Sequence, residues 1–141
     1  MSTPRLEDMG VGQEVAAASV HVDRQRLVAY AAASGDQNPI HQDEDFARSV
    51  GLPDVIAHGM WTMGAALEVL TGWLDDPTAI VSYSTRFTSP VVVPADGGAD
   101  IEVSATVKKI EAESGQVALE LNVTSGETKV LGRALALVSL R

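Results

Sequence analysis

The sequence of 141 residues contains no cysteine. This absence excludes disulfides, thiolate nucleophiles and cysteine-ligated metals, and it fits a reducing compartment such as the cytoplasm. Basic residues are also few, since ten lysines and arginines stand against nineteen acidic residues, for a formal net charge of −9. Binding to a phosphate backbone requires clustered cations, so nucleic acid is not an expected partner.

Long apolar runs and leader-like segments are missing as well. The first twelve residues are polar and mixed in charge, unlike a signal peptide with its apolar centre. The most apolar segment, residues 58–74, has helical spacing and spans roughly 25 Å, which is short for a membrane helix. We therefore expect a cytoplasmic protein with no membrane insertion. Its length is that of a single domain, residues 1–141.

The first half of the chain shows the features of one strand and several helices. Residues 14–22 are typical of a strand, and Asp23 is a good N-cap for a helix that ends near Gly35. Asp43 is placed to cap a second, short helix. Residues 58–74 carry apolar side chains at helical intervals, and their other faces are mostly uncharged. This pattern predicts a helix that is buried nearly all round.

From Ile80 onward the apolar period changes from helical spacing to two. Four segments alternate apolar and polar side chains, which predicts half-buried antiparallel strands over residues 80–88, 101–108, 117–123 and 131–140. Turns at residues 113–115 and 125–127 join the last three into a meander. One strand, then helices, then four strands indicate an α+β domain in which a single antiparallel sheet curls around the apolar helix.

A polar loop between the first two predicted helices carries residue types that suit proton transfer. It runs from Ser34 to His41 and contains Asp36 and Asn38. Pro39 pushes the residue before it out of the helical conformation, so the loop is expected to be irregular. An aspartate and a histidine on one tight loop are able to flank a single water or hydroxyl, as general acid–base catalysis requires. The alternative is a purely structural turn.

A second motif stands at the start of the apolar helix, at His58 and Gly59. The first turn of a helix has unpaired N–H groups and the positive end of the helix dipole, so it can stabilise an enolate-like thioester oxygen. Gly59 allows a ligand to approach this turn because it has no Cβ. The alternatives are close packing for Gly59 and a structural or capping role for His58. His21, on the first strand, is assigned no role.

The pattern Asp36-x-Asn38-x-x-His41, followed by His58 and Gly59 at the head of an apolar helix, resembles the MaoC-like hydratase/dehydratase family of hot-dog proteins, the (R)-specific enoyl hydratases. The similarity covers nearly the whole chain. It is greatest to the catalytic B subunit of actinobacterial (3R)-hydroxyacyl-ACP dehydratases. Further matching segments are Thr62-Met63-Gly64, Arg86-Phe87, Val93-Pro94 and Gly132-Arg133.

The resemblance implies a hot-dog fold that works as a homodimer, or as a heterodimer with a related hot-dog subunit. It implies that Asp36 and His41 are the catalytic pair, and that Asn38, Gly59 and His58 contribute to substrate binding. No cofactor and no metal are implied. Some family members carry a serine in the central helix near the aspartate, and this chain has Leu67 at the corresponding position.

The implied reaction is the reversible conversion of a (3R)-hydroxyacyl thioester of ACP or CoA into a trans-2-enoyl thioester and water. In the hydration direction Asp36 is expected to take a proton from water, while His41 orients the water and supplies a proton toward C2. An imidazole with a pKa of about 6.5 can serve as either acid or base near neutral pH, so the opposite division of roles stays open. The Gly59 amide is expected to bind the thioester carbonyl. The small residues Gly64, Ala65 and Ala66 either leave room for the acyl chain or permit close packing of the sheet.

Two other functions stay open at the level of sequence. One is a hot-dog thioesterase that uses Asp43 or Glu68 as the base. The other is a non-catalytic acyl-binding subunit that supports a separate catalytic chain. A metal site built from Asp36, His41, Asp43 and His58 has a suitable composition, but its spacing matches no known ligand pattern.

Overall fold

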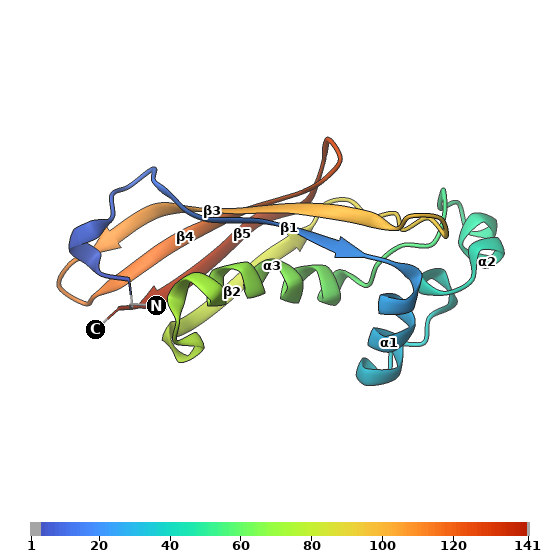
Figure 1. The fold of residues 1–141 in the computed structure, drawn as a ribbon, viewed down its shortest axis with the longest axis horizontal. Helices are drawn as coiled ribbons and strands as arrows, with labels where there is room; N and C mark the ends of the chain where they lie inside the picture. Colours follow the sequence, from blue (N-terminus) through green and yellow to red (C-terminus); the bar gives the residue numbers. More distant parts are fainter. Residues whose placement is uncertain (1–3, 141) are drawn as a thin grey trace.

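The chain folds into one antiparallel sheet with a long helix against one of its faces, as the computed structural model of residues 4–140 shows (Figure 1). The strands are β1 (Glu14–Val22), β2 (Ile80–Phe87), β3 (Ala99–Glu111), β4 (Gln116–Ser125) and β5 (Thr128–Ser139). The α-helices are α1 (Arg24–Ser34), α2 (Glu44–Ser49) and α3 (Gly59–Leu74). Short 3-10 helices are η1 (Leu6–Asp8), η2 (Pro39–His41) and η3 (Pro77–Ala79).

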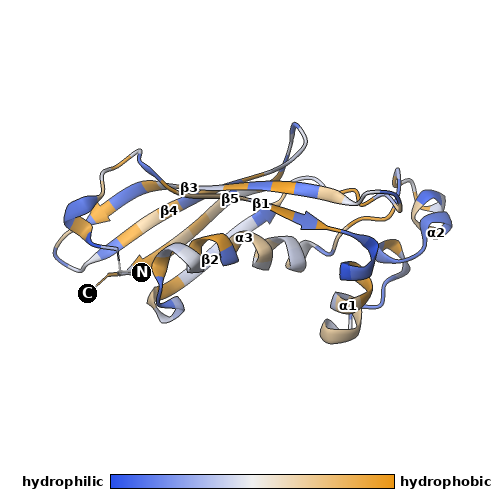
Figure 2. Ribbon diagram, in the orientation of Figure 1, coloured by the Kyte–Doolittle hydropathy of each residue, from blue (hydrophilic) through white to orange (hydrophobic). Residues whose placement is uncertain are grey.

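The strand order in the sheet is β1-β3-β4-β5-β2, and every neighbouring pair is antiparallel. The predicted α+β class and the meander of the last three strands are therefore confirmed. The period-two pattern is visible along β3 as alternating hydrophilic and hydrophobic bands (Figure 2). β3 is longer at both ends than predicted, because pairing with β1 and β4 extends it past the alternating residues.

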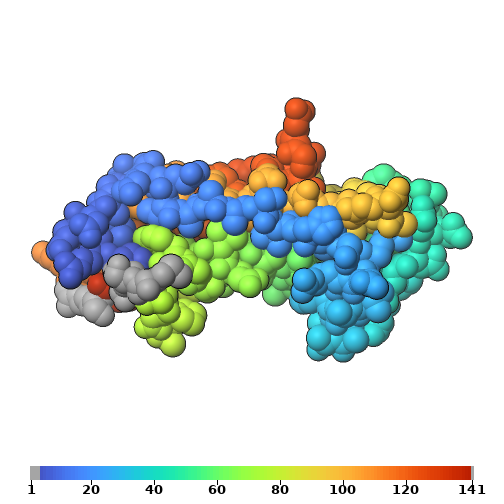
Figure 3. All heavy atoms as spheres, viewed as in Figure 1, coloured from blue at the N-terminus to red at the C-terminus, as the bar shows by residue number. Residues whose placement is uncertain are grey.

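Helix α3 packs its apolar side against the sheet. Ala66, Leu70 and Leu74 are fully buried and belong to the same core cluster as the inward side chains of β3, β4 and β5. The prediction that this helix is buried nearly all round is wrong. A stripe with four-residue spacing is exposed, comprising Met60, Gly64, Glu68 and Gly72, and α3 reaches the molecular surface (Figure 3). The reason is that the one sheet covers only one side of the helix.

Helix caps at the two ends of α1 and at the start of α2 follow the sequence signals. The Asp23 side chain accepts the Arg26 N–H at 2.8 Å, and the Asp43 side chain accepts the Phe46 N–H at 3.1 Å. Both helices lie at the end of the sheet where α3 begins (Figure 1). The loop that joins them is thereby carried to the first turn of α3. No helix in the described part of the chain is long and apolar enough to cross a membrane.

The connection between β2 and β3 contains two glycines with left-handed backbones. Gly97 has φ 84° and Gly98 has φ 66°. A Cβ added at Gly97 would meet nothing within 4 Å, whereas one added at Gly98 would overlap the Val22 carbonyl oxygen and lie 3.1 Å from His21 Nε2. Only Gly98 is therefore both conformationally special and closely packed, at the point where this connection passes the end of β1.

We expect Gly98→Ala to destabilise the fold more than Gly97→Ala. Both substitutions incur the cost of a left-handed L-residue, about 1–2 kcal/mol. Gly98→Ala also forces the connection away from β1, which should add roughly 1–3 kcal/mol as an overpacking cost. The measurement is urea denaturation of both variants. Equal losses would show that the backbone angle alone accounts for the effect.

Candidate active site

The polar loop after α1 is held in shape by its own side chains. Gly35 has φ 83°, and its N–H donates to the Ala31 carbonyl at 3.0 Å, which ends the helix. The Asp36 carboxylate accepts the Asn38 N–H at 3.1 Å, and the Asn38 side-chain oxygen accepts the Ile40 N–H at 3.2 Å. These bonds close successive Asx-type turns. Asn38 therefore supports the carboxylate through its backbone, as the loop enters η2.

His41, at the end of η2, is buried with 7% of its surface exposed. Its Nδ1 lies 2.7 Å from the Ile56 carbonyl oxygen. A carbonyl only accepts hydrogen bonds, so Nδ1 carries the hydrogen and Nε2 of the neutral ring holds a free lone pair. Burial is the largest influence on the ring and lowers the pKa of His41 below 6.5, although the Ile56 carbonyl opposes this effect. The neutral form is thereby favoured.

His58 immediately precedes α3 and is even more deeply buried, at 2% exposure. Its Nε2 lies 3.1 Å from the backbone carbonyl oxygen of Asp36. The His41 and His58 rings are stacked, with centroids 3.8 Å apart and an angle of 23° between their planes. The ring of Tyr30, from α1, is tilted against the His58 ring, with ring centroids 4.7 Å apart. His58 thus connects the polar loop to the start of α3.

A cavity of about 350 Å³ opens beside these groups. His41 and Gly59 both line it, so the catalytic imidazole expected from sequence and the first turn of α3 face one space. His58 and Asp36 are not among the lining residues. The remaining walls are mostly apolar and come from distant parts of the chain: Ile56, Ala57, Thr62, Phe87, Thr88, Ser89, Pro90, Val91, Val130 and Leu131.

The segment that supplies the Ile56 carbonyl is pinned between two other parts of the chain. On one side, the Ile56 N–H donates to the Ile40 carbonyl at 3.2 Å. On the other side, the Val93 N–H donates to the Val55 carbonyl and the Ala57 N–H to the Val91 carbonyl, at 2.8 and 2.9 Å. The carbonyl that orients His41 is therefore fixed by backbone pairing and is not a freely moving loop group.

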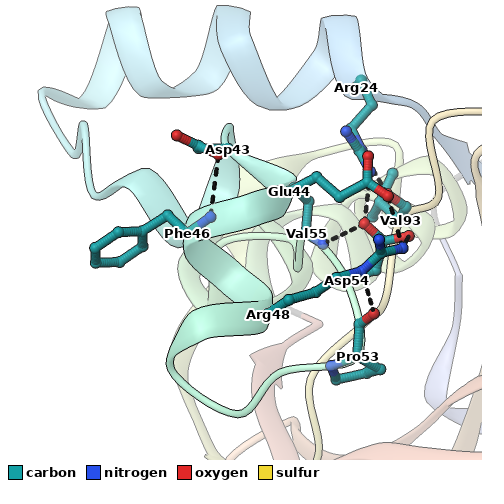
Figure 4. Close-up of polar contacts among 9 residues, drawn as sticks. All are labelled: Arg24, Asp43, Glu44, Phe46, Arg48, Pro53, Asp54, Val55 and Val93. Atoms are coloured by element: carbon teal, nitrogen blue, oxygen red, sulfur yellow. Dashed lines mark hydrogen bonds and ion pairs between the residues drawn. The ribbon is translucent and has the colours of Figure 1, made fainter.

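A partly buried ion pair strengthens this segment at its beginning (Figure 4). Arg24 at the start of α1 donates from Nη2 to the Asp54 carboxylate at 2.7 Å and from Nε to the Val93 carbonyl at 2.6 Å. The side chains of Arg24 and Asp54 are only 22% and 14% exposed. Arg48 of α2 approaches the other Asp54 oxygen at 3.9 Å. The pair ties both short helices to the segment that holds His41.

Asp36, His41 and His58 come close enough to be examined as a metal site. One possible ligand atom from each lies within 4.8 Å of the others, and Asp43 is not part of this group. However, Nδ1 of His41 and Nε2 of His58 already bind carbonyl oxygens. The rings are also stacked nearly parallel, so their in-plane lone pairs do not converge on one point. The geometry favours an acid–base pair over chelation.

The walls of the cavity include residues that the sequence did not assign to a site. Phe87, at the end of β2, lies directly over Gly59, since a Cβ on that glycine would come within 3.1–3.3 Å of its ring. Gly64 and Ala65 face a different cavity, about 370 Å³, together with Glu68. Gly64, Ala65 and Ala66 therefore do not border the space next to His41. Long-range packing brings Phe87 to the site, and its local sequence carries no signal for this.

Comparison with known proteins places the chain in a family. The model of the MaoC like domain matches residues 8–126. The chain belongs to the MaoC-like family.

The structure is also similar to solved hot-dog hydratases, so the expected hot-dog fold is confirmed. A MaoC-like dehydratase superposes with a TM-score of 0.96 at 37% identity over 99% of this chain. The (R)-hydratase from A. caviae involved in PHA biosynthesis gives 0.83 at 25% identity, covering 96% of this chain and 99% of that one.

Curated relatives of this MaoC-like chain carry the names of hydratases and dehydratases. The (R)-specific enoyl-CoA hydratase of Rhodospirillum rubrum is 31% identical over 138 residues, which is 96% of this chain and 92% of the relative. The 3-hydroxyacyl-thioester dehydratase X of Mycobacterium tuberculosis is 42% identical over 82 residues, 58% of this chain. The chain aligns with only 28% of that relative's length and 43% of the MaoC-like dehydratase structure.

The burial of His41 leads to a prediction about the pKa of its imidazole. We expect its pKa in the folded protein to lie below 6.5, and to return to about 6.5 in urea. Because the folded state binds the proton less tightly, the contribution of His41 to stability is complete above pH 6.5 and is lost as the pH falls through the folded-state pKa. NMR titration of the imidazole measures both values. A folded-state pKa at or above 6.5 would contradict the inferred environment.

Proposed function

We propose that this MaoC-like chain catalyses the reversible addition of water to trans-2-enoyl thioesters, giving (3R)-hydroxyacyl thioesters. The observation that carries the proposal is the shared cavity, in which His41 and the Gly59 turn of α3 face each other beside the Asp36 loop. The names of the relatives support the same reaction class. The proposed substrates are acyl thioesters of CoA or of an acyl carrier protein. The lack of cysteine is compatible with the proposed cytoplasmic location.

The first turn of α3 supplies the electrophilic part of the mechanism. Attack of water at C3 moves charge through C2 onto the thioester oxygen. The unpaired N–H groups and the dipole of a helix N-terminus stabilise such a charge. Loss of one such donor in other enzymes costs about 3–4 kcal/mol of transition-state stabilisation. We assign this donor to the backbone N–H of Gly59, whose missing Cβ leaves room for the Phe87 ring that lines the same cavity.

The burial of His41 supports a division of acid and base roles between His41 and Asp36 that differs from the one first expected from sequence. If His41 supplied a proton while Asp36 took one, the resting enzyme would need an imidazolium ring, which burial disfavours. We propose that neutral His41 takes the water proton at Nε2 as hydroxide adds to C3, and then delivers this proton to C2. Asp36 accepts a hydrogen bond from the other O–H of the water, which stays on the product hydroxyl, and stabilises the transient imidazolium. Dehydration follows the reverse path, and the pair ends as it began.

The residues considered for thioesterase chemistry lie away from this cavity. Asp43 caps α2 through the Phe46 N–H. Glu68 is on the exposed stripe of α3 and borders the second cavity. Neither lines the space shared by His41 and Gly59. Hydration is therefore better supported than hydrolysis, and a non-catalytic subunit would have no use for the paired Asp36 and His41.

The central test compares variants of the proposed pair. Asp36→Asn and His41→Ala should each lower kcat/KM with crotonyl-CoA and a longer enoyl-CoA by roughly 10²- to 10⁴-fold, the usual contribution of an acid–base group. Loss of the enoyl absorbance measures hydration, and a thiol reagent measures thioester hydrolysis. Glu68→Gln is the matched control and should retain hydratase activity. Release of thiol that depends on Glu68 would instead support the thioesterase.

We also propose that the chain dimerises through the β2 edge, either with itself or with a related hot-dog subunit. β2 is an edge strand, and Val81 and Phe87 along it are 55% and 53% exposed. Unpaired backbone groups together with exposed apolar side chains are typical of an interface. Met60, at the neighbouring start of α3, is 61% exposed.

The dimer proposal is tested by charge substitution at the edge. Val81→Lys should shift the purified chain toward monomer in light scattering, because an edge lysine opposes strand pairing. Val50→Lys is the control, since Val50 is equally exposed, at 55%, but lies just after α2. A monomer in both the unchanged protein and the variants would refute the homodimer and point to co-expression with a related subunit as the next measurement.

A further inference from the structure

His58 is the most deeply buried ionisable side chain near the site, and the proposed mechanism does not use it. It is 2% exposed and does not line the cavity beside His41. Its Nδ1 is buried without a hydrogen-bond partner among the described residues. The side chain does not cap α3, although it stands at the N-cap position. A polar ring held in such a place requires an explanation, since an unsatisfied buried acceptor costs about 1–3 kcal/mol.

The hydrogen-bond geometry determines the tautomer of His58. Its Nε2 faces the Asp36 carbonyl oxygen at 3.1 Å, and a carbonyl only accepts, so Nε2 carries the hydrogen. The unpartnered Nδ1 is then the acceptor of the ring. His58 holds its hydrogen on Nε2, whereas His41 holds its hydrogen on Nδ1.

We propose that His58 is a positioning residue that sets the relation between the two proton-handling groups. One edge of its ring holds the backbone of Asp36 by a hydrogen bond, and one face holds the ring of His41 by stacking. Because His58 is rigidly joined to the first residue of α3, the same ring also relates both groups to the Gly59 amide. This inference rests on the proposed hydratase function.

Two features of the surroundings explain why such a residue is needed. The other hydrogen bonds at Asp36 are local, to Ser34 and Asn38 within the same loop, so they shape the loop without tying it to α3. The Asp36 side chain itself is exposed. Tyr30 of α1 lies against the His58 ring and keeps it against its partners. A displacement of about 1 Å in catalytic groups can cost 10²-fold in rate.

The two contacts of His58 can be removed separately. His58→Phe retains a flat ring for His41 but has no donor for the Asp36 carbonyl. His58→Gln retains an N–H donor at a similar reach but has no ring. We expect His58→Phe to lower kcat roughly 10- to 100-fold with little change in KM. We expect His58→Gln to recover a large part of that loss. The control is His21→Gln, because His21 is an exposed histidine near the end of β1 that is paired with Asp100 and does not line the cavity beside His41.

Thermal unfolding separates positioning from packing. If kcat follows the melting temperature across the variants and His58→Gln is as slow as His58→Phe, His58 only fills space and the proposal fails. Unchanged kcat in His58→Phe also refutes it. These outcomes are distinct from failure of the hydratase function itself, which would leave the unchanged protein inactive or Asp36→Asn fully active. A positioning role would be supported by a kcat loss that Gln reverses.

A measurement without substrate tests the same geometry. ¹⁵N-labelled imidazole spectra near neutral pH should show His41 as the Nδ1–H tautomer and His58 as the Nε2–H tautomer in the same molecule. In His58→Phe the His41 tautomer should persist, because the Ile56 carbonyl determines it. Detection of His58 as the Nδ1–H tautomer would overturn the proposed bond to Asp36, whatever the activity.

Discussion

The packing of α3 against the sheet is the constraint on which the rest of this structure depends. Burial of Ala66, Leu70 and Leu74 against β3, β4 and β5 fixes the position of the helix, and therefore of its first turn. The polar loop is delivered to this turn from the other side, because α1 and α2 lie at the same end of the sheet (Figure 1). The site is thus the meeting point of a hydrophobic core and a polar connection.

Backbone carbonyls do much of the chemical preparation in this site. The Ile56 carbonyl keeps the hydrogen of His41 on Nδ1, and the Asp36 carbonyl keeps that of His58 on Nε2. A carbonyl cannot exchange donor and acceptor roles, so each histidine is limited to one tautomer. The Ile56 carbonyl is itself fixed by paired backbone on both sides and by the Arg24–Asp54 ion pair (Figure 4). Structural residues at some distance therefore prepare His41 for its proposed role as a proton acceptor.

The exposed side of α3 and the free edge of β2 have a common physical origin. A single five-stranded sheet is too small to enclose a sixteen-residue helix, so the side away from the sheet stays uncovered. The sequence pattern of α3, apolar on nearly every face, is that of a helix with more than one neighbour. Assembly with a second hot-dog subunit would reconcile the pattern with the structure.

Local rules of the sequence were sufficient for the elements and for the candidate pair. Asp23, Gly35 and Asp43 mark helix ends because capping depends on a few neighbouring residues, and the period-two segments became strands because one face of each packs on the core. The proximity of Asp36 and His41 follows from their five-residue separation.

Tertiary structure alone decided the rest. Three contacts join residues 15 to 28 positions apart, on separate segments: the stacking of His58 on His41, the hydrogen bond between His41 and the Ile56 carbonyl, and the position of Phe87 over Gly59. Nothing in the local sequence encodes such contacts, because they arise only when the core places α3, β2 and the polar loop side by side. The sequence determined which groups were available for chemistry, and the packing of the core determined which of them face one another.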